Sequence, residues 1–218
     1  MVLHNEAVIV RPAAGAALLA TLGLALAGCG GGSSSGSGGS GSSASGTTGG
    51  SSPATVQSVS LTAQGTALKV GQAATVSWQP SKHPVGVVKL KVTQLEKAPI
   101  SAFDAWQLDP ATKKSTPYYV HAHVQNVGTH SLAGVPVPLY LLDDSNVLLQ
   151  ASTFKATFPA CPSTPLPPKF THGKKASVCL VYFVPKHGSM SAVSFRPTPS
   201  FDAITWTGPV QKAKQPKK

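Results

Sequence analysis

Runs in which apolar and polar residues alternate fill much of the chain beyond residue 54. In one of them, Val88, Leu90 and Val92 are separated by lysines. The same alternation recurs at 119–124, 137–141 and 176–184. A period of two places successive side chains on opposite faces of a β-strand, and no run in this region repeats at the helical period of about 3.6 residues. The pattern predicts β-strands with one buried and one solvated face.

Turn-forming residues separate these runs. Gly71, Asn126 and Asp143 each begin a short polar segment between two apolar ones. Asp and Asn side chains stabilise turns by bonding nearby backbone groups. Four prolines between Pro162 and Pro168 favour an extended loop over a strand. Short strands joined by turns, without helices, predict an antiparallel β-sandwich or barrel.

Five motifs of this region occur in a characteristic order. They are Val70–Trp78, Val88–Leu95, Tyr119–Gly128, Val137–Asp144 and Val178–Pro185. This order resembles the telokin-like, immunoglobulin-fold domain of exported lipoproteins from actinobacteria and other Gram-positive bacteria. The resemblance covers most of 66–209. It implies an all-β fold, an immunoglobulin-like antiparallel β-sandwich, and it brings no catalytic residues with it.

The first 28 residues have the layout of an export signal. Arg11 precedes an apolar run that ends at Gly28. The run is shorter than the roughly 20 residues that a membrane-spanning helix needs, although an uncleaved anchor is the alternative. Leu26–Cys29 resembles the lipobox of bacterial lipoproteins. That resemblance implies cleavage before Cys29 and a lipid on its thiol, which anchors the mature chain to the outer face of the cell membrane.

A linker follows Cys29. Residues 30–52 hold ten glycines and ten serines in 23 positions, too little apolar surface for a core. Such a coil has an r.m.s. span of roughly 25 Å. A plain spacer and an O-glycosylated stalk both fit the composition. The expected organisation is a signal peptide at 1–28, lipidated cysteine and linker at 29–53, the β-sandwich at 54–209 and a basic tail at 210–218.

The three cysteines leave one pair once Cys29 carries a lipid. Cys161 and Cys179 would meet in an oxidising compartment, which predicts a disulfide. In the chain-entropy model a loop of this size stabilises the fold by about 3 kcal/mol. Two free thiols are the alternative. The sequence does not indicate a redox-active pair, because it lacks a Cys-x-x-Cys spacing and any sign of an activated thiolate.

His121 and His123 form the sharpest candidate binding site. Residues two apart on a strand point to the same side, with Cα atoms roughly 7 Å apart, so both imidazoles can ligate one zinc or copper ion. His130, beyond the next turn, is a possible third ligand. No carboxylate is close in sequence. The simpler interpretation places both histidines on a solvated face, with Val120 and Val124 in the core.

The charge of the chain and the motifs it lacks restrict the classes of function that it can have. Basic residues outnumber acidic ones by 18 to 7, which gives a net charge of +11. With seven carboxylates and no Gly-x-Ser-x-Gly or His-Glu-x-x-His motif, neither an enzyme nor a cofactor is predicted. For an exported chain the expected polyanions are anionic lipid headgroups or acidic wall polymers, not nucleic acid. The candidate contacts are Lys212, Lys214, Lys217 and Lys218, and a solvated terminus is the simpler interpretation.

The sequence thus predicts a membrane-anchored surface lipoprotein. Its immunoglobulin-like domain binds an unknown protein or small-molecule ligand, or has a structural role in the envelope, without catalysis. One alternative is extracytoplasmic binding or delivery of zinc or copper through His121 and His123. A second alternative is a hydrolase whose active-site residues are brought together only by the fold and cannot be recognised in the sequence.

Overall fold

The computed structural model describes residues 59–214, so the signal peptide, Cys29 and the Gly/Ser linker lie outside the described residues. The described strands are β1 (Ala67–Lys69), β2 (Ala73–Trp78), β3 (Gly86–Lys97), β4 (Thr116–Asn126), β5 (Tyr140–Asp143), β6 (Leu148–Gln150), β7 (Lys175–Val184), β8 (Met190–Phe195), β9 (Ile204–Thr207) and β10 (Val210–Lys212). Three 3-10 helical turns accompany them: η1 (Ile100–Phe103), η2 (Thr112–Lys114) and η3 (Pro185–His187).

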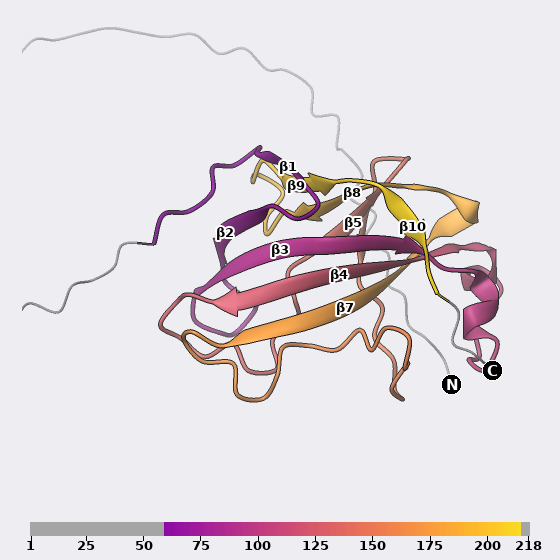
Figure 1. Cartoon of the computed structure of the whole chain (residues 1–218), viewed down its shortest axis with the longest axis horizontal. Helices are drawn as coiled ribbons and strands as arrows, with labels where there is room; N and C mark the ends of the chain where they lie inside the picture. Colours follow the sequence, from indigo (N-terminus) through magenta and orange to yellow (C-terminus); the bar gives the residue numbers. More distant parts are fainter. Residues whose placement is uncertain (1–58, 215–218) are drawn as a thin grey trace, which may run out of the picture. The chain divides into compact units, whose positions relative to one another are not determined.

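The strands form two sheets, seen as a front and a back layer in Figure 1. The back sheet has the order β1-β9-β8-β5-β6, and the front sheet has the order β10-β3-β4-β7. β2 pairs with the first half of β3 and β10 with its last residues, so both lie on the same edge of that strand. This arrangement confirms the predicted all-β sandwich.

Two strand pairs depart from a purely antiparallel sandwich. β1 runs parallel to β9, and β10 runs parallel to β3, whereas the other pairs are antiparallel. Both parallel pairs join strands that are far apart in sequence. No tight hairpin connects them, so nothing local imposes an antiparallel direction.

The main hydrophobic core fills the space between the sheets. Val120, Ala122 and Val124 of β4 are buried there, as the alternation predicts. Phe195 and Trp206 pack against them from the other sheet and are fully buried. At about 25 cal/mol per Å² of apolar surface, side chains of this size dominate the stability of such a domain.

A β-bulge in β3 changes which of its residues face the core. The register with β4 shifts between Val92 and Gln94, so one extra residue is accommodated. Leu90 and Val92 are buried before the bulge, and Leu95 is buried after it. Gln94 and Glu96 are thereby directed to the opposite face, away from the main core. The bulge is the reason that a carboxylate lies on that face at all.

Two element boundaries differ from those predicted. The strand expected from the alternation at 137–141 begins only at Tyr140, because Pro138 has no N–H to donate to a sheet ladder. The sandwich also continues past residue 209, where a basic tail was expected. Val210–Lys212 pair with Leu95–Lys97, so Lys212 belongs to a sheet edge. All three residues of β10 are exposed, and hence no apolar alternation marks this strand.

Two predicted turns are confirmed. Buried Asn126 ends β4, and its Nδ2 donates to the carbonyls of His130 and Phe170 at 2.8 and 2.9 Å. Asp143 ends β5, and its Oδ1 accepts from two backbone N–H groups of the following turn. Both side chains therefore replace backbone partners where the sheet ladder stops.

Candidate functional site

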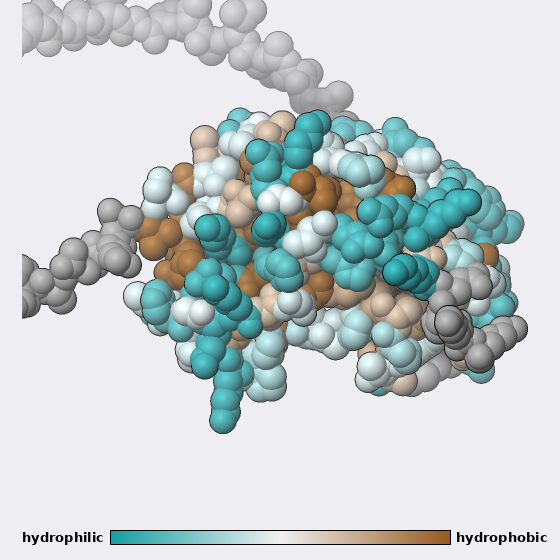
Figure 2. All heavy atoms as spheres, in the orientation of Figure 1, coloured by the Kyte–Doolittle hydropathy of each residue, from teal (hydrophilic) through white to brown (hydrophobic). Residues whose placement is uncertain are grey.

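The candidate residues gather on the outer face of the front sheet, the face directed away from the main core. Figures 1 and 2 look onto this face. Strand pairing aligns its side chains in rungs that cross β3, β4 and β7. Along the strands, the face divides into an aromatic cluster, a polar row around His121 and a lysine-rich end.

The aromatic cluster covers the end of the face where β4 begins and β7 ends. Phe103 of η1 stacks on Phe158, with ring centroids 4.6 Å apart, and meets Phe183 of β7 edge-on at 4.9 Å. Tyr119 of β4 lies in the same cluster and is buried. The sequence pattern assigned Tyr119 to the same face as the histidines. The long connections after β3 and β6 fold back and remove this part of the face from solvent.

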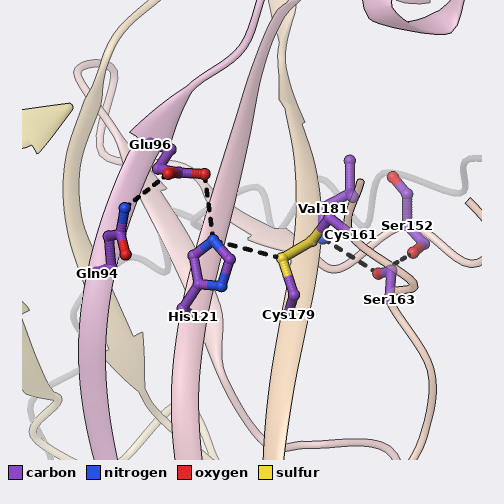
Figure 3. The surroundings of a disulfide bond; sticks show 8 residues. All are labelled: Gln94, Glu96, His121, Ser152, Cys161, Ser163, Cys179 and Val181. Carbon is purple, nitrogen blue, oxygen red and sulfur yellow. Dashed lines mark hydrogen bonds and ion pairs between the residues drawn. A yellow bond between two sulfur atoms is a disulfide. The ribbon is translucent and has the colours of Figure 1, made fainter. Parts of the chain in front are cut away.

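A disulfide joins one of these connections to the sheet. Cys161 and Cys179 are bonded, with Cα atoms 5.1 Å apart, which confirms the predicted pair (Figure 3). Ser163, which is two residues after Cys161, donates its backbone N–H to the carbonyl of Cys179 at 2.9 Å. Its Oγ donates to the carbonyl of Ser152 and accepts from the N–H of Val181. The proline-rich connection is thus attached to β7 by covalent and hydrogen bonds together.

His121 occupies the polar row beside the disulfide (Figure 3). Its Nε2 lies 3.2 Å from Oε2 of Glu96 on β3 and 3.7 Å from Sγ of Cys179 on β7. Gln94 donates to the other carboxylate oxygen of Glu96 at 2.6 Å and to Gln211 of β10 at 3.2 Å. The His121 side chain is 32% exposed and that of Glu96 13%, so water reaches this contact only in part.

Sequence reasoning missed Glu96 as the partner of His121. The two residues are 25 positions apart, and an uninterrupted alternation from Val92 would place Glu96 on the inner face. The spacing of three residues between Val92 and Leu95 is the one signal in the sequence that reveals the bulge.

His123 lies on the same face as His121 but has a different partner. Its Nδ1 is 3.0 Å from Oγ of Ser177, and the residue is exposed. His130 follows the end of β4 and contributes its backbone carbonyl to Asn126. No group of three His, Cys, Asp or Glu side chains that could hold a metal ion occurs within residues 59–214. Metal binding through His121 and His123 stays a prediction.

Exposed lysines gather at the other end of the face, where β3 and β7 begin and β4 ends. We call this set the cationic end: Lys82, Lys89, Lys91, Lys174 and Lys175. Hydrophilic side chains are prominent at the lower left of Figure 2, beside some hydrophobic ones. Strand pairing aligns Lys89 with Gln125 and Lys175, and it aligns Lys91 with His123. The sequence pattern identified the two β3 lysines as polar positions, but not their grouping with the lysines that begin β7.

The cationic end has no internal counter-charge. Across residues 59–214, the single ion pair is the one between His121 and Glu96. Asp143 and Asp144 accept hydrogen bonds from the backbone of neighbouring turns. The lysines of the cationic end are therefore not paired with a carboxylate within residues 59–214 and are open to solvent or to a partner.

Two predicted features fall wholly or partly outside the described residues. The lipidation site, Cys29, is among them, as are Lys217 and Lys218 of the predicted basic contact. Of the remaining two lysines, Lys212 is in β10 and Lys214 follows it, both exposed. None of the helical turns within residues 59–214 has the length and apolar character needed to cross a membrane.

Comparison with known proteins gives one distant likeness. No family model and no curated protein matches the chain. Among solved structures, MPT63, a secreted protein of Mycobacterium tuberculosis, is similar at 13% identity and a TM-score of 0.42. The likeness covers 67% of this chain and 100% of that one. At that level it assigns neither a family nor a function.

Proposed function

We propose that the chain is an exported lipoprotein whose β-sandwich is a non-catalytic binding or envelope-structural domain. The observation that carries the proposal is the sequence Leu26–Cys29 at the end of an apolar run. In this proposal a lipid on Cys29 holds the domain at the outer face of the cell membrane. Acylation with more than one chain gives stable anchoring, which a single chain does not.

The disulfide supports the exported location. Disulfides persist in oxidising compartments outside the cytosol and are rare within it. The bond between Cys161 and Cys179 also leaves Cys29 as the remaining thiol of the three in the chain. The cysteine content is therefore accounted for by one structural bond and one lipid.

The contacts on the outer face favour a binding or structural role. Glu96 is held by His121 and Gln94, and Ser163 is held by backbone groups of β7 and of Ser152. These side chains brace neighbouring strands and loops. The exposed lysines beside them are available to a partner, and charge at a surface directs association more than it performs chemistry.

Metabolic labelling with a palmitate analogue tests the anchor. We expect the wild-type protein to be labelled, shortened at its N-terminus and recovered with membranes, and Cys29→Ala to lose the label and the cleavage. A Cys161→Ala/Cys179→Ala variant is the matched control, because it removes two thiols but keeps Cys29. Lipid label on the Cys29→Ala protein, or loss of label in the control alone, contradicts the proposal.

A further inference from the structure

Charge is segregated along the front sheet. Lys89 and Lys91 lie in the first half of β3, whereas Glu96 lies next to its last residue, Lys97. The segments that build the cationic end, 73–91, 123–130 and 169–177, contain no Asp or Glu. Asp202 precedes β9, in the other sheet. The outer face thus has one end with lysines alone and another where a carboxylate and the aromatic cluster lie.

Three of the lysines form a compact array on the outer face of the sheet. Lys89 and Lys91 are two residues apart on one strand, which places their Cα atoms about 7 Å apart. Lys175 lies two strands away in the same rung as Lys89, at about 10 Å from strand spacing. Gln125, which is polar and uncharged, lies between Lys89 and Lys175, and His123 and Ser177 continue the rung of Lys91. Such an array fits a surface that carries many negative charges.

An exposed apolar residue adjoins the array. Val85 is 51% exposed and immediately precedes β3, in the same loop as Lys82 and His83. An apolar side chain flanked by cations suits the boundary between lipid headgroups and acyl chains, where charged and apolar contacts are both available. A soluble acidic polymer offers no partner for the valine.

The chain reaches the sandwich next to these lysines. Thr62 donates its N–H to the carbonyl of Thr75 on β2 at 2.8 Å, and the N–H of Thr75 donates to Oγ1 of Thr62 at 2.9 Å. Thr75 is paired with Lys89 on the adjacent strand. About 30 residues separate Cys29 from this point, and a chain of that length cannot extend beyond about 110 Å. A lipid on Cys29 would therefore keep the cationic end within reach of the membrane.

We propose that the cationic end is a docking surface for anionic phospholipid headgroups of the membrane that holds the anchor. The proximity of that membrane rests on the proposed lipoprotein function, whereas the charge array and Val85 do not. Near an anionic surface each lysine raises the partition coefficient about fivefold. The tether adds effective concentration, so modest intrinsic affinity suffices to orient the domain.

Vesicle sedimentation tests the surface without the lipid on Cys29. The probe is the mature chain from residue 30 to 218, which keeps every described residue, both hydrophobic clusters and the disulfide. It is mixed with vesicles of phosphatidylcholine alone or with about one-third phosphatidylglycerol. We expect binding to the anionic vesicles only, and a loss of binding as salt is raised, because salt screens exposed charges.

Two triple variants with equal change in charge locate the contact. Lys89→Gln/Lys91→Gln/Lys175→Gln should lower the partition coefficient about 100-fold. The matched control, Lys113→Gln/Lys114→Gln/Lys155→Gln, removes three exposed lysines from connections elsewhere and should lower it less than tenfold. Equal losses in the two variants, or equal binding to neutral and anionic vesicles, would overturn the proposal.

Inorganic polyphosphate distinguishes a soluble polyanion from a membrane. If polyphosphate binds the cationic end while anionic vesicles do not, the partner is a polymer and the membrane assignment is wrong. Because the sedimented protein lacks Cys29, failure here leaves the lipoprotein proposal standing. Failure of the palmitate labelling experiment, in turn, leaves the vesicle result unaffected.

Discussion

Two buried tyrosines on neighbouring strands differ in whether their hydroxyl groups are satisfied. Tyr182 of β7 points into the main core and donates to the carbonyl of Leu139 at 2.8 Å. Tyr119 of β4 points into the aromatic cluster, and its hydroxyl has no hydrogen-bond partner within the described residues. Replacing each tyrosine with phenylalanine removes one oxygen and keeps the ring. The pair therefore isolates the energetic value of a single buried hydroxyl in two settings.

The two substitutions should have opposite effects on the free energy of unfolding. A buried hydroxyl without a partner costs about 1–3 kcal/mol, so Tyr119→Phe should stabilise the protein by about 1 kcal/mol. A satisfied hydrogen bond contributes about 1 kcal/mol, so Tyr182→Phe should destabilise it by about that amount. The ring of Tyr119, 5.9 Å from Phe158 and 6.3 Å from Phe103, keeps its edge-on contacts in the variant.

Urea unfolding followed by tryptophan fluorescence measures the difference, since Trp206 is fully buried in the main core. The free energy of unfolding falls by about 1–3 kcal/mol per M of urea. A difference of about 2 kcal/mol between the two variants therefore separates their urea midpoints by roughly 1 M. If Tyr119→Phe destabilises the protein as much as Tyr182→Phe does, the hydroxyl of Tyr119 is satisfied in solution and the reasoning fails.

Alkaline pH gives an independent test of the same hydroxyl. Burial, assisted by the carboxylate of Glu96, raises the pKa of Tyr119 to about 12. An unfolded tyrosine ionises near pH 10. The stability that comes from keeping Tyr119 neutral is therefore complete below about pH 10 and is lost as the pH rises towards 12. We expect the unfolding midpoint of Tyr119→Phe to fall less steeply than that of the wild type over this range.

Two further predictions concern the disulfide and the histidines. Denatured protein kept without reductant should show no alkylation of Cys161 or Cys179, and quantitative alkylation of both would contradict the bond. Replacing either cysteine should lower the free energy of unfolding, measured by heat or urea, by about 2–5 kcal/mol. Zinc or copper should leave the Tm of the wild type and of His121→Gln/His123→Gln equally unchanged, because Glu96 and Ser177 hold the imidazoles. A rise in Tm confined to the wild type would instead establish the metal site. It would correspond to a stabilisation of about 2.7 kcal/mol with the metal at 100 times its Kd.

The parts of the fold that could be predicted are those with long, regular alternation. β4 and β7 are each ten or more residues long and direct alternate residues into the main core, so their inner faces follow from the sequence. β10 has three exposed residues, among them Lys212, and such a segment is indistinguishable from a solvated terminus. Pairing with Leu95–Lys97 is a property of the folded sheet that no local pattern encodes.

The candidate site was only half predictable for a related reason. Alternation places His121 and His123 on one face, because that follows from strand period alone, whereas the position of Cys179 beside His121 follows from strand pairing. It also assigns Tyr119 to solvent, since the phenylalanines that cover it come from connections without periodicity. Glu96 joins the site through a bulge that reverses the phase of β3. Loops and bulges act over long sequence distances, beyond what a window of neighbouring residues contains.

The exposed edges of the two sheets determine how easily a strand of one copy could pair with a strand of another. Of the edge strands, β1, β6 and β10 have three residues each. The six-residue strand β2 is occupied at Thr75 by Thr62, and the longer edge of β7 is occupied near Val181 by Ser152 and Ser163. A foreign strand would find few consecutive free backbone groups to pair with. Proteins confined to a surface collide far more often than the same number free in solution. Interrupted edges would let many copies crowd together there without joining their sheets into aggregates.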